Sequence, residues 1–470
     1  MSINRRDFIK ATGATIAGSM IVSPAFSSAI KNTSAKKKVA LVGTGIRGIS
    51  FFGKFLKDEY SDVVEFVGLS DINPGRLAYA KEHIGVDCPL FTDFDEMLEK
   101  VDIDLLMVTT VDSTHDEFIV KALDMGIDVV TEKPMTTDEK KCQKIIDAQR
   151  RSKARLIMAF NYRYGKLFTK LKEIIQSKEI GELISIDLNW ILNTYHGASY
   201  FRRWHGLRSK SGTLLLHKSA HHFDLLNWFI GSDPVEVHAY GALEKYGKNN
   251  SFRGPNCRTC TLKESCKFYW DMTTNETYMK LYAANEKYDG YIRDKCLWRE
   301  EIDIFDKMAV QVKYANHVQV SYSLTTYSPF EGFRFAINGK DGRLETHEGI
   351  PWRDNVQEDQ SKIYEKGMDH SSHSKAELKY HEIVSQRNFE EFKRIEFPFV
   401  RKGHWGGDKR MFDEIFRGKV IDPALHHASS MRDGSLAVLV GIAARISIDE
   451  GRPVKIEELT DLVPQYNKWE

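Results

Sequence analysis

The residues best suited to bind a cofactor form the run Gly43-Thr44-Gly45-Ile46-Arg47-Gly48. Glycines at these spacings allow a tight turn, a close approach of pyrophosphate oxygens to the backbone N–H groups around Ile46 and Arg47, and close packing of the following helix. An apolar run over residues 38–42 precedes the glycines, and residues 49–56 are expected to be helical. This strand–glycine–helix order predicts a dinucleotide-binding turn.

An acidic residue follows at the position that such a site needs. A second predicted strand, residues 63–69, ends in Ser70-Asp71. A carboxylate there accepts hydrogen bonds from the adenosine ribose hydroxyls, and its charge repels a 2′-phosphate. We therefore expect NAD rather than NADP, although Arg76 nearby is a residue that would favour NADP.

Three more apolar runs, residues 104–110, 127–130 and 156–159, complete the expected parallel sheet. Ser113 or Thr114 is expected to cap the helix that ends at Gly126, and Thr136 with Glu139 is expected to form a capping box for the next helix. The carboxyl ends of parallel strands face the ligand crevice. The residues at these ends are Thr109-Thr110, Thr131-Glu132-Lys133-Pro134 and Phe160-Asn161-Tyr162-Arg163.

These motifs, in this order, resemble the Gfo/Idh/MocA oxidoreductases, the family of glucose-fructose oxidoreductase and inositol dehydrogenase. The resemblance runs from about Lys38 to the C-terminus. It implies an α/β protein with an N-terminal Rossmann domain, residues 36–158, and a C-terminal α/β domain, residues 159–470, with an open, mainly antiparallel sheet. It also implies nucleotide contacts from Gly43, Gly45, Ile46, Arg47, Gly48, Asp71, Thr109, Thr110, His115, Glu132, Lys133 and Asn161.

The strands of the second sheet are visible as alternating or continuous apolar runs. They are residues 183–192, 235–240, 308–314, 318–324 and 333–337, with Ala315-Asn316 as a hairpin turn between two of them.

Two histidines one helical turn apart, His217 and His221, are expected to share one helix face. In the resembling family this face looks onto the nicotinamide ring, and an aspartate stands where this chain has His217. Oxidation of an alcohol needs a base for the hydroxyl proton, a task that suits a histidine. By resemblance His221 is that base, and Lys133 stabilises the alkoxide. His217 is then expected to orient the substrate, share the proton or bind a metal.

Other polar and aromatic residues are candidates for sugar contacts, and each has an ordinary surface or packing role as its alternative. They are Arg163, Arg203, Trp204, Lys218, His222 and His404.

Four cysteines lie in an expected insertion at about residues 245–300: Cys257, Cys260, Cys266 and Cys296. Four thiols in a short segment are typical of two disulfides or of a structural zinc site, with an iron–sulfur cluster as a third alternative. An exported protein favours disulfides.

Export is predicted from the N-terminus. Asn4-Arg5-Arg6-Asp7-Phe8-Ile9-Lys10, an apolar run to Val22 and small residues before Ala29 are typical of a twin-arginine signal peptide, residues 1–29. Because this route carries folded proteins, a periplasmic enzyme would leave the cytoplasm with its nucleotide already bound.

Composition limits the partners. The chain has 470 residues and a net charge of +1, which gives no electrostatic argument for nucleic acid or for an anionic membrane surface. A small sugar or glycoside substrate and no stable membrane anchor are therefore expected. The family resemblance implies a homo-oligomer. The favoured function is an NAD-dependent dehydrogenase of a sugar, glycoside or polyol. The alternatives are a glycoside hydrolase that oxidises C3 transiently and a non-catalytic sugar-binding protein.

Overall fold

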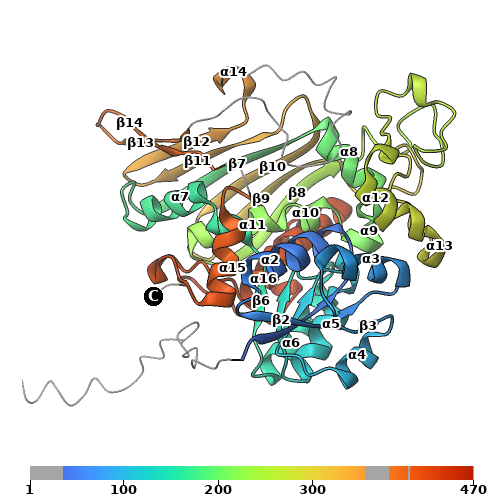
Figure 1. Cartoon of the computed structure of the whole chain (residues 1–470). Helices are drawn as coiled ribbons and strands as arrows, with labels where there is room; N and C mark the ends of the chain where they lie inside the picture. Colours follow the sequence, from blue (N-terminus) through green and yellow to red (C-terminus); the bar gives the residue numbers. More distant parts are fainter. Residues whose placement is uncertain (1–34, 355–379, 401–402, 469–470) are drawn as a thin grey trace, which may run out of the picture. The chain divides into compact units, whose positions relative to one another are not determined.

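The structure, a computed structural model, describes residues 35–354, 380–400 and 403–468 (Figure 1). The predicted signal peptide, residues 1–29, lies outside the described residues. The described residues from 36 onward fall in one compact unit.

The first domain is built on a six-stranded parallel sheet in the order β3-β2-β1-β4-β5-β6. Its order confirms the predicted Rossmann domain, because the strand sequence reverses direction at β1 and β4 and leaves a ligand crevice there. The strands are β1 (Lys37–Val42), β2 (Val64–Ser70), β3 (Leu90–Phe91), β4 (Leu105–Val108), β5 (Asp128–Thr131) and β6 (Leu156–Met158).

The helices of this domain differ from prediction at their starts. Thr136 does not cap a helix: the Asp138 side chain accepts the Lys141 N–H at 3.0 Å and begins α6. Thr114 makes no cap bond either, because its hydroxyl donates to the Val111 carbonyl. The helical elements are η1 (Gly48–Phe55, a π-helix), α2 (Leu56–Tyr60), α3 (Pro74–Ile84), α4 (Phe94–Lys100), η2 (Asp112–Thr114), α5 (His115–Asp124) and α6 (Glu139–Arg151).

The second domain contains a nine-stranded sheet in the order β14-β13-β12-β11-β7-β10-β9-β8-β15. Only β7 and β10 pair in parallel, so the predicted mainly antiparallel sheet is confirmed. Along β9 buried and exposed residues alternate, so one face of that strand packs on the core. The strands are β7 (Leu183–Asn193), β8 (Pro234–Ala242), β9 (Lys307–Tyr314), β10 (Gln319–Ser328), β11 (Gly332–Gly339), β12 (Gly342–Glu348), β13 (Tyr380–Arg387), β14 (Lys393–Pro398) and β15 (Val454–Lys455).

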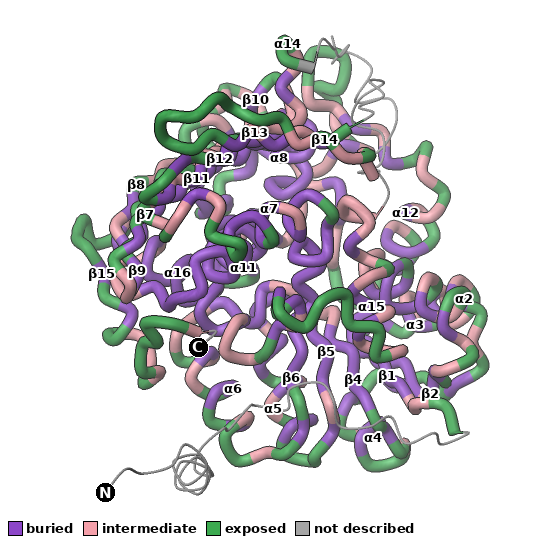
Figure 2. The backbone as a smooth tube through the Cα atoms, turned by 90° about the vertical axis from the view of Figure 1, so that its left-hand side faces the viewer, coloured by how far each residue is buried: buried purple, intermediate pink, exposed green. Residues whose placement is uncertain are grey.

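The helix α16 joins this sheet to the first domain, and the fully buried helix α11 packs against it (Figure 2). Every residue of α11 is buried, and α16 packs on α11, β8 and α6. The helical elements outside the insertion are η3 (Asn161–Tyr164), α7 (Lys166–Gln176), α8 (Thr194–Arg202), η4 (Trp204–Gly206), α9 (Arg208–Ser211), α10 (Leu214–His217), α11 (Ala220–Ile230), α14 (Pro351–Asp354), α15 (Gly407–Arg417), η10 (Pro423–Leu425), α16 (Met431–Glu450) and η11 (Ile456–Glu458).

The insertion between β8 and β9, residues 245–300, consists of short helical segments and loops. Its aromatic residues Trp270, Tyr278 and Tyr282 belong to the same apolar cluster as core residues of β1 and α3, so it packs against the Rossmann domain. The segments are η5 (Lys263–Ser265), η6 (Met272–Thr274), α12 (Glu276–Leu281), η7 (Ala283–Asn285) and α13 (Glu286–Asp289).

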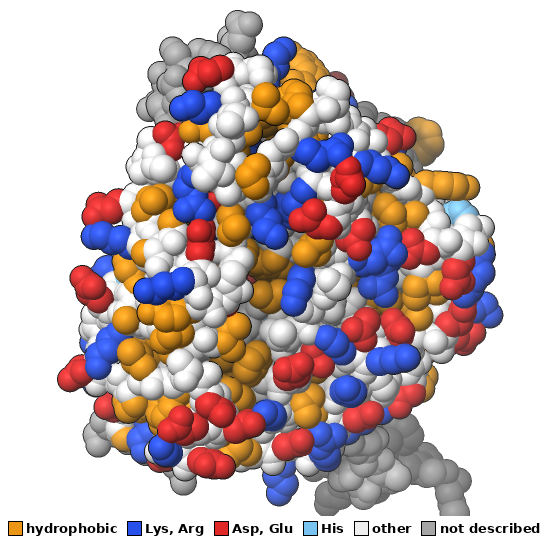
Figure 3. Space-filling view, turned by 90° about the vertical axis from the view of Figure 1, so that its right-hand side faces the viewer, with side chains coloured by type: hydrophobic (Ala, Val, Ile, Leu, Met, Phe, Trp, Pro, Cys, Tyr) orange, Lys and Arg blue, Asp and Glu red, His pale blue; other side chains and the backbone are white. Residues whose placement is uncertain are grey.

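The surface drawn in Figure 3 carries Lys and Arg side chains interspersed with Asp and Glu, in keeping with the balanced charge of the chain. Among the described residues, no helix has the length and apolar content needed to cross a membrane.

Candidate active site

The glycine run forms a tight turn at the end of β1. Gly43 has φ +91°, and a Cβ atom there would lie 2.6 Å from the backbone of Thr109. The Thr109 hydroxyl donates to the Gly43 carbonyl at 2.6 Å, which fixes the turn against the end of β4. A Cβ atom on Gly45 would meet only the Tyr282 hydroxyl, at 3.5 Å. Among the described residues, no side chain other than Tyr282 approaches the backbone at Gly45, and the Tyr282 hydroxyl accepts the neighbouring Ile46 N–H at 2.8 Å.

Asp71 lies beside this turn at the end of β2 and is almost fully hydrogen-bonded. Its Oδ2 atom accepts from the N–H and the hydroxyl of Thr44, at 2.7 and 2.9 Å. Its Oδ1 atom accepts from the Asn73 N–H at 2.9 Å and from Arg76 Nη2 at 3.0 Å. The carboxylate thus fixes the glycine loop.

The strand end Glu132-Lys133 is tied to the same loop. Arg47 Nε donates to Glu132 Oε1 at 2.5 Å, and Glu132 Oε2 accepts the Lys133 N–H at 3.0 Å. Although burial opposes it, the charges of Arg47 and Lys133 lower the pKa of Glu132. The ionised Glu132 therefore holds the Lys133 backbone at the carboxyl end of β5.

Lys133, His217 and Asp112 form a connected polar group. Lys133 Nζ donates to the His217 carbonyl at 2.8 Å and lies 3.4 Å from His217 Nε2. His217 Nδ1 lies 2.6 Å from Asp112 Oδ2. Burial lowers the pKa of Lys133 to about 8, and burial together with the charge of Lys133 lowers the pKa of His217 well below its usual value. Burial raises the pKa of Asp112. This arrangement holds one proton between an imidazole and a carboxyl beside a lysine.

His221 presents a second imidazole nearby. Its ring stacks on Tyr162 with centroids 4.1 Å apart and an interplanar angle of 2°. Its Nδ1 atom is buried and has no hydrogen-bond partner among the described residues. Burial and the charge of Lys133 lower the pKa of His221, so the ring is neutral at pH 7 and able to accept a proton.

The prediction that His217 and His221 share one helix is wrong. His217 ends α10, and α11 begins at Ala220 after a turn at Lys218-Ser219. The turn forms because the Ser219 N–H bonds the Leu214 carbonyl five residues back and the Ser219 hydroxyl contacts the Tyr322 hydroxyl at 2.8 Å.

Four of the predicted substrate residues lie around these histidines. Lys218 Nζ donates to the Tyr162 hydroxyl at 3.1 Å. The His404 ring lies 5.7 Å from the Tyr162 ring, and the Trp204 ring meets His217 edge-on at 5.7 Å. Arg203 bonds the Ser199 carbonyl and lies over Tyr200, whose ring also packs against His217.

Two others lie in the core, so their predicted substrate contacts do not fit this placement. Arg163 is fully buried, and it binds both carboxylate oxygens of Asp224, at 2.8 and 2.5 Å, and Asp433 at 3.1 Å. His222 is also fully buried, stacked 4.0 Å from Trp190 and bonded to the Tyr322 hydroxyl.

Three predicted nucleotide contacts are used by the protein itself. Both His115 ring nitrogens face backbone carbonyls, those of Pro134 at 2.8 Å and Thr110 at 3.2 Å. The Asn161 amide donates to Asp408 at 2.6 Å and lies 3.0 Å from His404 Nδ1. The Thr110 and Thr114 hydroxyl oxygens lie 2.9 Å apart, within hydrogen-bond distance. These residues position the strand ends around the site.

Sequence reasoning missed Asp112 and missed Tyr162 as the ring partner of His221. Asp112 follows the apolar run 104–110, and an acidic residue just after a strand end is the signal that identifies Asp71. The pairing of Asp112 with His217 has no local sequence signal, because the two residues come from different domains.

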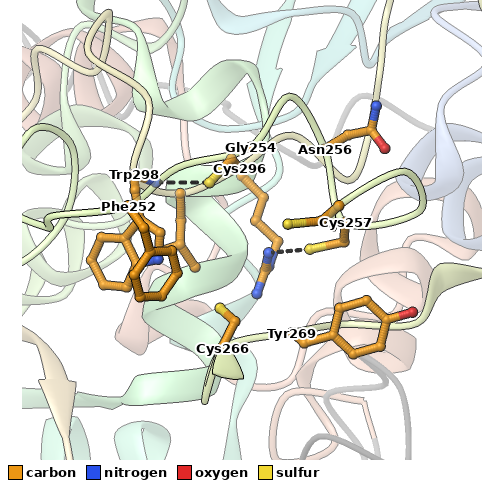
Figure 4. A pocket seen from close by; sticks show the side chains of 11 residues that line it. Phe252, Gly254, Asn256, Cys257, Cys266, Tyr269, Cys296 and Trp298 are labelled. Carbon is orange, nitrogen blue, oxygen red and sulfur yellow. Dashed lines mark hydrogen bonds between the residues drawn. The ribbon is translucent and has the colours of Figure 1, made fainter. Parts of the chain in front are cut away.

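The four insertion cysteines line one pocket, together with Arg202 and Trp298 (Figure 4). All four are free thiols, so the expected disulfides are not formed. Within residues 35–354, 380–400 and 403–468, no group of three or more His, Cys, Asp or Glu side chains is arranged to hold a metal, so structural zinc is not supported. Instead, Cys257 Sγ accepts a hydrogen bond from Arg202 at 3.0 Å, and burial raises the pKa of Cys257.

A Rossmann domain with a glycine cradle and a lysine–histidine group at its strand ends defines an NAD-binding oxidoreductase. Comparison with known proteins agrees. Residues 37–160 match the family described as "Oxidoreductase family, NAD-binding Rossmann fold", and residues 172–456 match its "C-terminal alpha/beta domain". The chain belongs to the Gfo/Idh/MocA oxidoreductase family.

Two relatives show how far along the chain this similarity extends. The protein YteT of Bacillus subtilis (strain 168) is 35% identical over 442 residues, which cover 90% of this chain and 98% of YteT. Inositol 2-dehydrogenase of Salmonella typhimurium (strain LT2) is 26% identical over 204 residues, 43% of this chain and 57% of that protein.

Two solved structures share the fold. Levoglucosan dehydrogenase in complex with NADH and levoglucosan has a TM-score of 0.61 at 16% identity, over 90% of this chain and 100% of its own. The WlbA dehydrogenase from Chromobacterium violaceum with NADH and UDP-GlcNAcA has a TM-score of 0.60 at 20% identity. The match covers 90% of this chain and 96% of the WlbA chain.

Proposed function

We propose that this protein oxidises a CH–OH group of a sugar, glycoside or polyol by hydride transfer to an NAD that it retains. The observation that carries the proposal is the convergence of Lys133, His217 and His221 at the carboxyl end of β5, where Glu132 links Lys133 to the glycine loop.

The residues divide the chemistry between them. The bound dinucleotide supplies the acceptor for the hydride. Lys133 is a cation below about pH 8 and stabilises the developing alkoxide. His221 is neutral, has a buried nitrogen without a partner among the described residues, and takes the hydroxyl proton. His217, held by Asp112, orients Lys133 through the contacts at its carbonyl and Nε2.

A carbohydrate substrate is supported by the surroundings of this group. Trp204 offers a half-buried aromatic ring beside His217, and Lys218, Arg203 and His404 offer polar groups to hydroxyls. Among the relatives, inositol 2-dehydrogenase acts on a polyol by its name, and levoglucosan is bound in a structure with the same fold.

Export and retention of the nucleotide belong to the same proposal. The twin-arginine sequence at Arg5-Arg6 supports passage of the folded protein to the periplasm, where no pool of nucleotide refills an empty site. The NADH that forms from a retained NAD must be reoxidised in place by a second sugar or keto-sugar. By family resemblance we further propose that the protein is a homo-oligomer.

A redox-neutral reaction is the second candidate. In a glycoside hydrolase of this kind, C3 is oxidised and the C2 proton and the aglycone are eliminated. Water then adds to the unsaturated sugar and the hydride returns to C3, so a trapped NAD suffices. A nucleotide that is retained where no free NAD is present favours the glycoside hydrolase as much as the dehydrogenase.

One experiment separates these functions. The purified protein is denatured and the released nucleotide identified, and glycosides and polyols are then screened for keto products and free aglycone. Keto products support the dehydrogenase, and net hydrolysis supports the glycosidase. Protein that holds no nucleotide and turns over only with added NAD contradicts retention.

A further inference from the structure

A segment of the insertion, residues 276–293, covers the adenosine end of the expected dinucleotide site, and we call it the strap. It contacts the Rossmann domain at three points. The Tyr282 hydroxyl accepts the Ile46 N–H at 2.8 Å. The Asn285 carbonyl accepts from Asn73 Nδ2 at 3.0 Å. Asp289 Oδ2 lies 2.6 Å from Arg76 Nη1. Figure 1 shows its helices α12 and α13 beside α3.

The strap is rigidly built. The Arg293 guanidinium lies 4.2 Å from the centre of the Tyr278 ring and 4.5 Å from that of Tyr282. A Cβ atom on Gly75 of α3 would overlap the Asn285 side chain, so the two segments are in close contact. The contact between the strap and α3 is therefore a packed interface.

The positive charge of Arg76 is neutralised by Asp71 and by Asp289 of the strap. Its Nη2 atom bonds Asp71 Oδ1 at 3.0 Å, and its Nη1 atom bonds Asp289 at 2.6 Å. Its side chain is only 11% exposed. An arginine just after the second strand of a Rossmann domain is placed to bind a 2′-phosphate, which carries two negative charges. Here both of its outer nitrogens already hold carboxylates.

We propose that the strap completes the dinucleotide site and that Asp289 selects NAD by holding Arg76 away from a 2′-phosphate. The argument rests on the proposed function, since it requires a bound dinucleotide. A 2′-phosphate would meet two carboxylates and a neutralised arginine, and it would have to displace Asp289 to gain a cationic partner. NAD, without that phosphate, requires no such displacement.

The test is the identity of the bound nucleotide. Each variant is first unfolded to free the nucleotide that it retains and is then refolded in equal concentrations of NAD and NADP. It is freed of unbound nucleotide and denatured again, and the released nucleotides are quantified. Wild-type protein is expected to release NAD. Asp289→Asn should raise the NADP-to-NAD ratio at least about 10-fold, the size of one charge-assisted hydrogen bond. Arg76→Met added to Asp289→Asn should return the ratio to the wild-type value.

A control and a second variant keep the result interpretable. Glu276→Gln changes an exposed carboxylate of the strap that pairs with Lys280, and it should leave the ratio unchanged. Asp289→Ser replaces Asp289→Asn if the latter fails to fold. An unchanged ratio in a folded Asp289 variant that holds NAD overturns this inference and leaves the proposed function standing. Wild-type protein that releases NADP overturns it as well, and wild-type protein that holds neither nucleotide overturns the proposed function and this inference together.

Discussion

His217 Nδ1 and Asp112 Oδ2 lie 2.6 Å apart, although the two residues come from different domains. Asp112 begins η2 after β4 of the Rossmann sheet, and His217 ends α10 of the second domain. Asp112 is 3% exposed, so its carboxyl group has His217 in place of water. This contact fixes which His217 nitrogen faces Lys133.

Asp112→Asn is expected to lower kcat about 10-fold or more while KM and the nucleotide content change little. The amide keeps the shape of the side chain but cannot take a proton from Nδ1, so the imidazole loses its fixed tautomer. The measurement is steady-state kinetics over a range of pH, in which a positioning role also shifts the pH profile. Wild-type kinetics at every pH would show that the pair only supports the fold.

Removal of the predicted base or of the predicted alkoxide partner should be more severe. His221→Ala and Lys133→Met are each expected to lower turnover about 100-fold or more, because proton removal and alkoxide stabilisation are lost. The nucleotide released on denaturation should be unchanged. His238→Ala, on β8 beside Tyr240, serves as the histidine control. If both site variants keep wild-type turnover, the assignment of these residues is wrong.

The lowered pKa of Lys133, about 8, sets the alkaline side of the pH profile. Below that pH the lysine is a cation and stabilises an alkoxide, and above it this stabilisation is lost, so kcat/KM should fall as the pH rises through about 8. The pKa of His221 lies well below its usual value, so the base is already neutral across this range. Lys133→Arg keeps its charge at high pH and should lose the alkaline fall. Identical alkaline limbs in both proteins would exclude Lys133 as their origin.

The fold was largely predictable because its signals are local. The predicted apolar runs at 38–42, 104–110 and 183–192 each coincide with a strand of the structure to within a few residues, and the glycine run lies at the turn after β1. The features that sequence reasoning missed depend on contacts between distant segments. The break between α10 and α11 depends on Tyr322 of β10, and the strap meets α3 from about 200 residues away along the chain. Arg163 follows a strand end as a ligand contact would, yet it faces Asp224 in the core.

This burial makes Arg163 a test of structure against function. Arg163→Ala leaves Asp224 as an unpaired buried carboxylate, so it should lower the free energy of unfolding by about 3–5 kcal/mol. Arg203→Ala, at a half-buried position beside the histidines, should change stability by less than about 1 kcal/mol and raise KM. Urea unfolding in the same nucleotide state, with kinetics of the folded variants, measures both. If the Arg163→Ala protein is as stable as wild type and its KM is raised, Arg163 contacts the substrate and does not have the structural role assigned here.

In the family pattern that this chain resembles, an aspartate stands at the position of His217. The contact between His217 and Asp112 predicts how the substitution His217→Asp changes activity. His217→Asp places a second carboxylate against the buried Asp112, and two such groups cannot both ionise, so one of them holds a proton. The single variant should therefore be less active than His217→Asn, in which no second charge is introduced.

The double variant tests the same contact. Asp112→Asn combined with His217→Asp removes the repulsion, because the new amide donates to the new carboxylate, which then faces Lys133. This double variant is expected to exceed His217→Asp in kcat/KM by about 10-fold, the effect of relieving roughly one pKa unit of repulsion. The four proteins are compared by kinetics and by the nucleotide that each releases. If His217→Asp alone is as active as wild type, Asp112 does not control the charge at position 217.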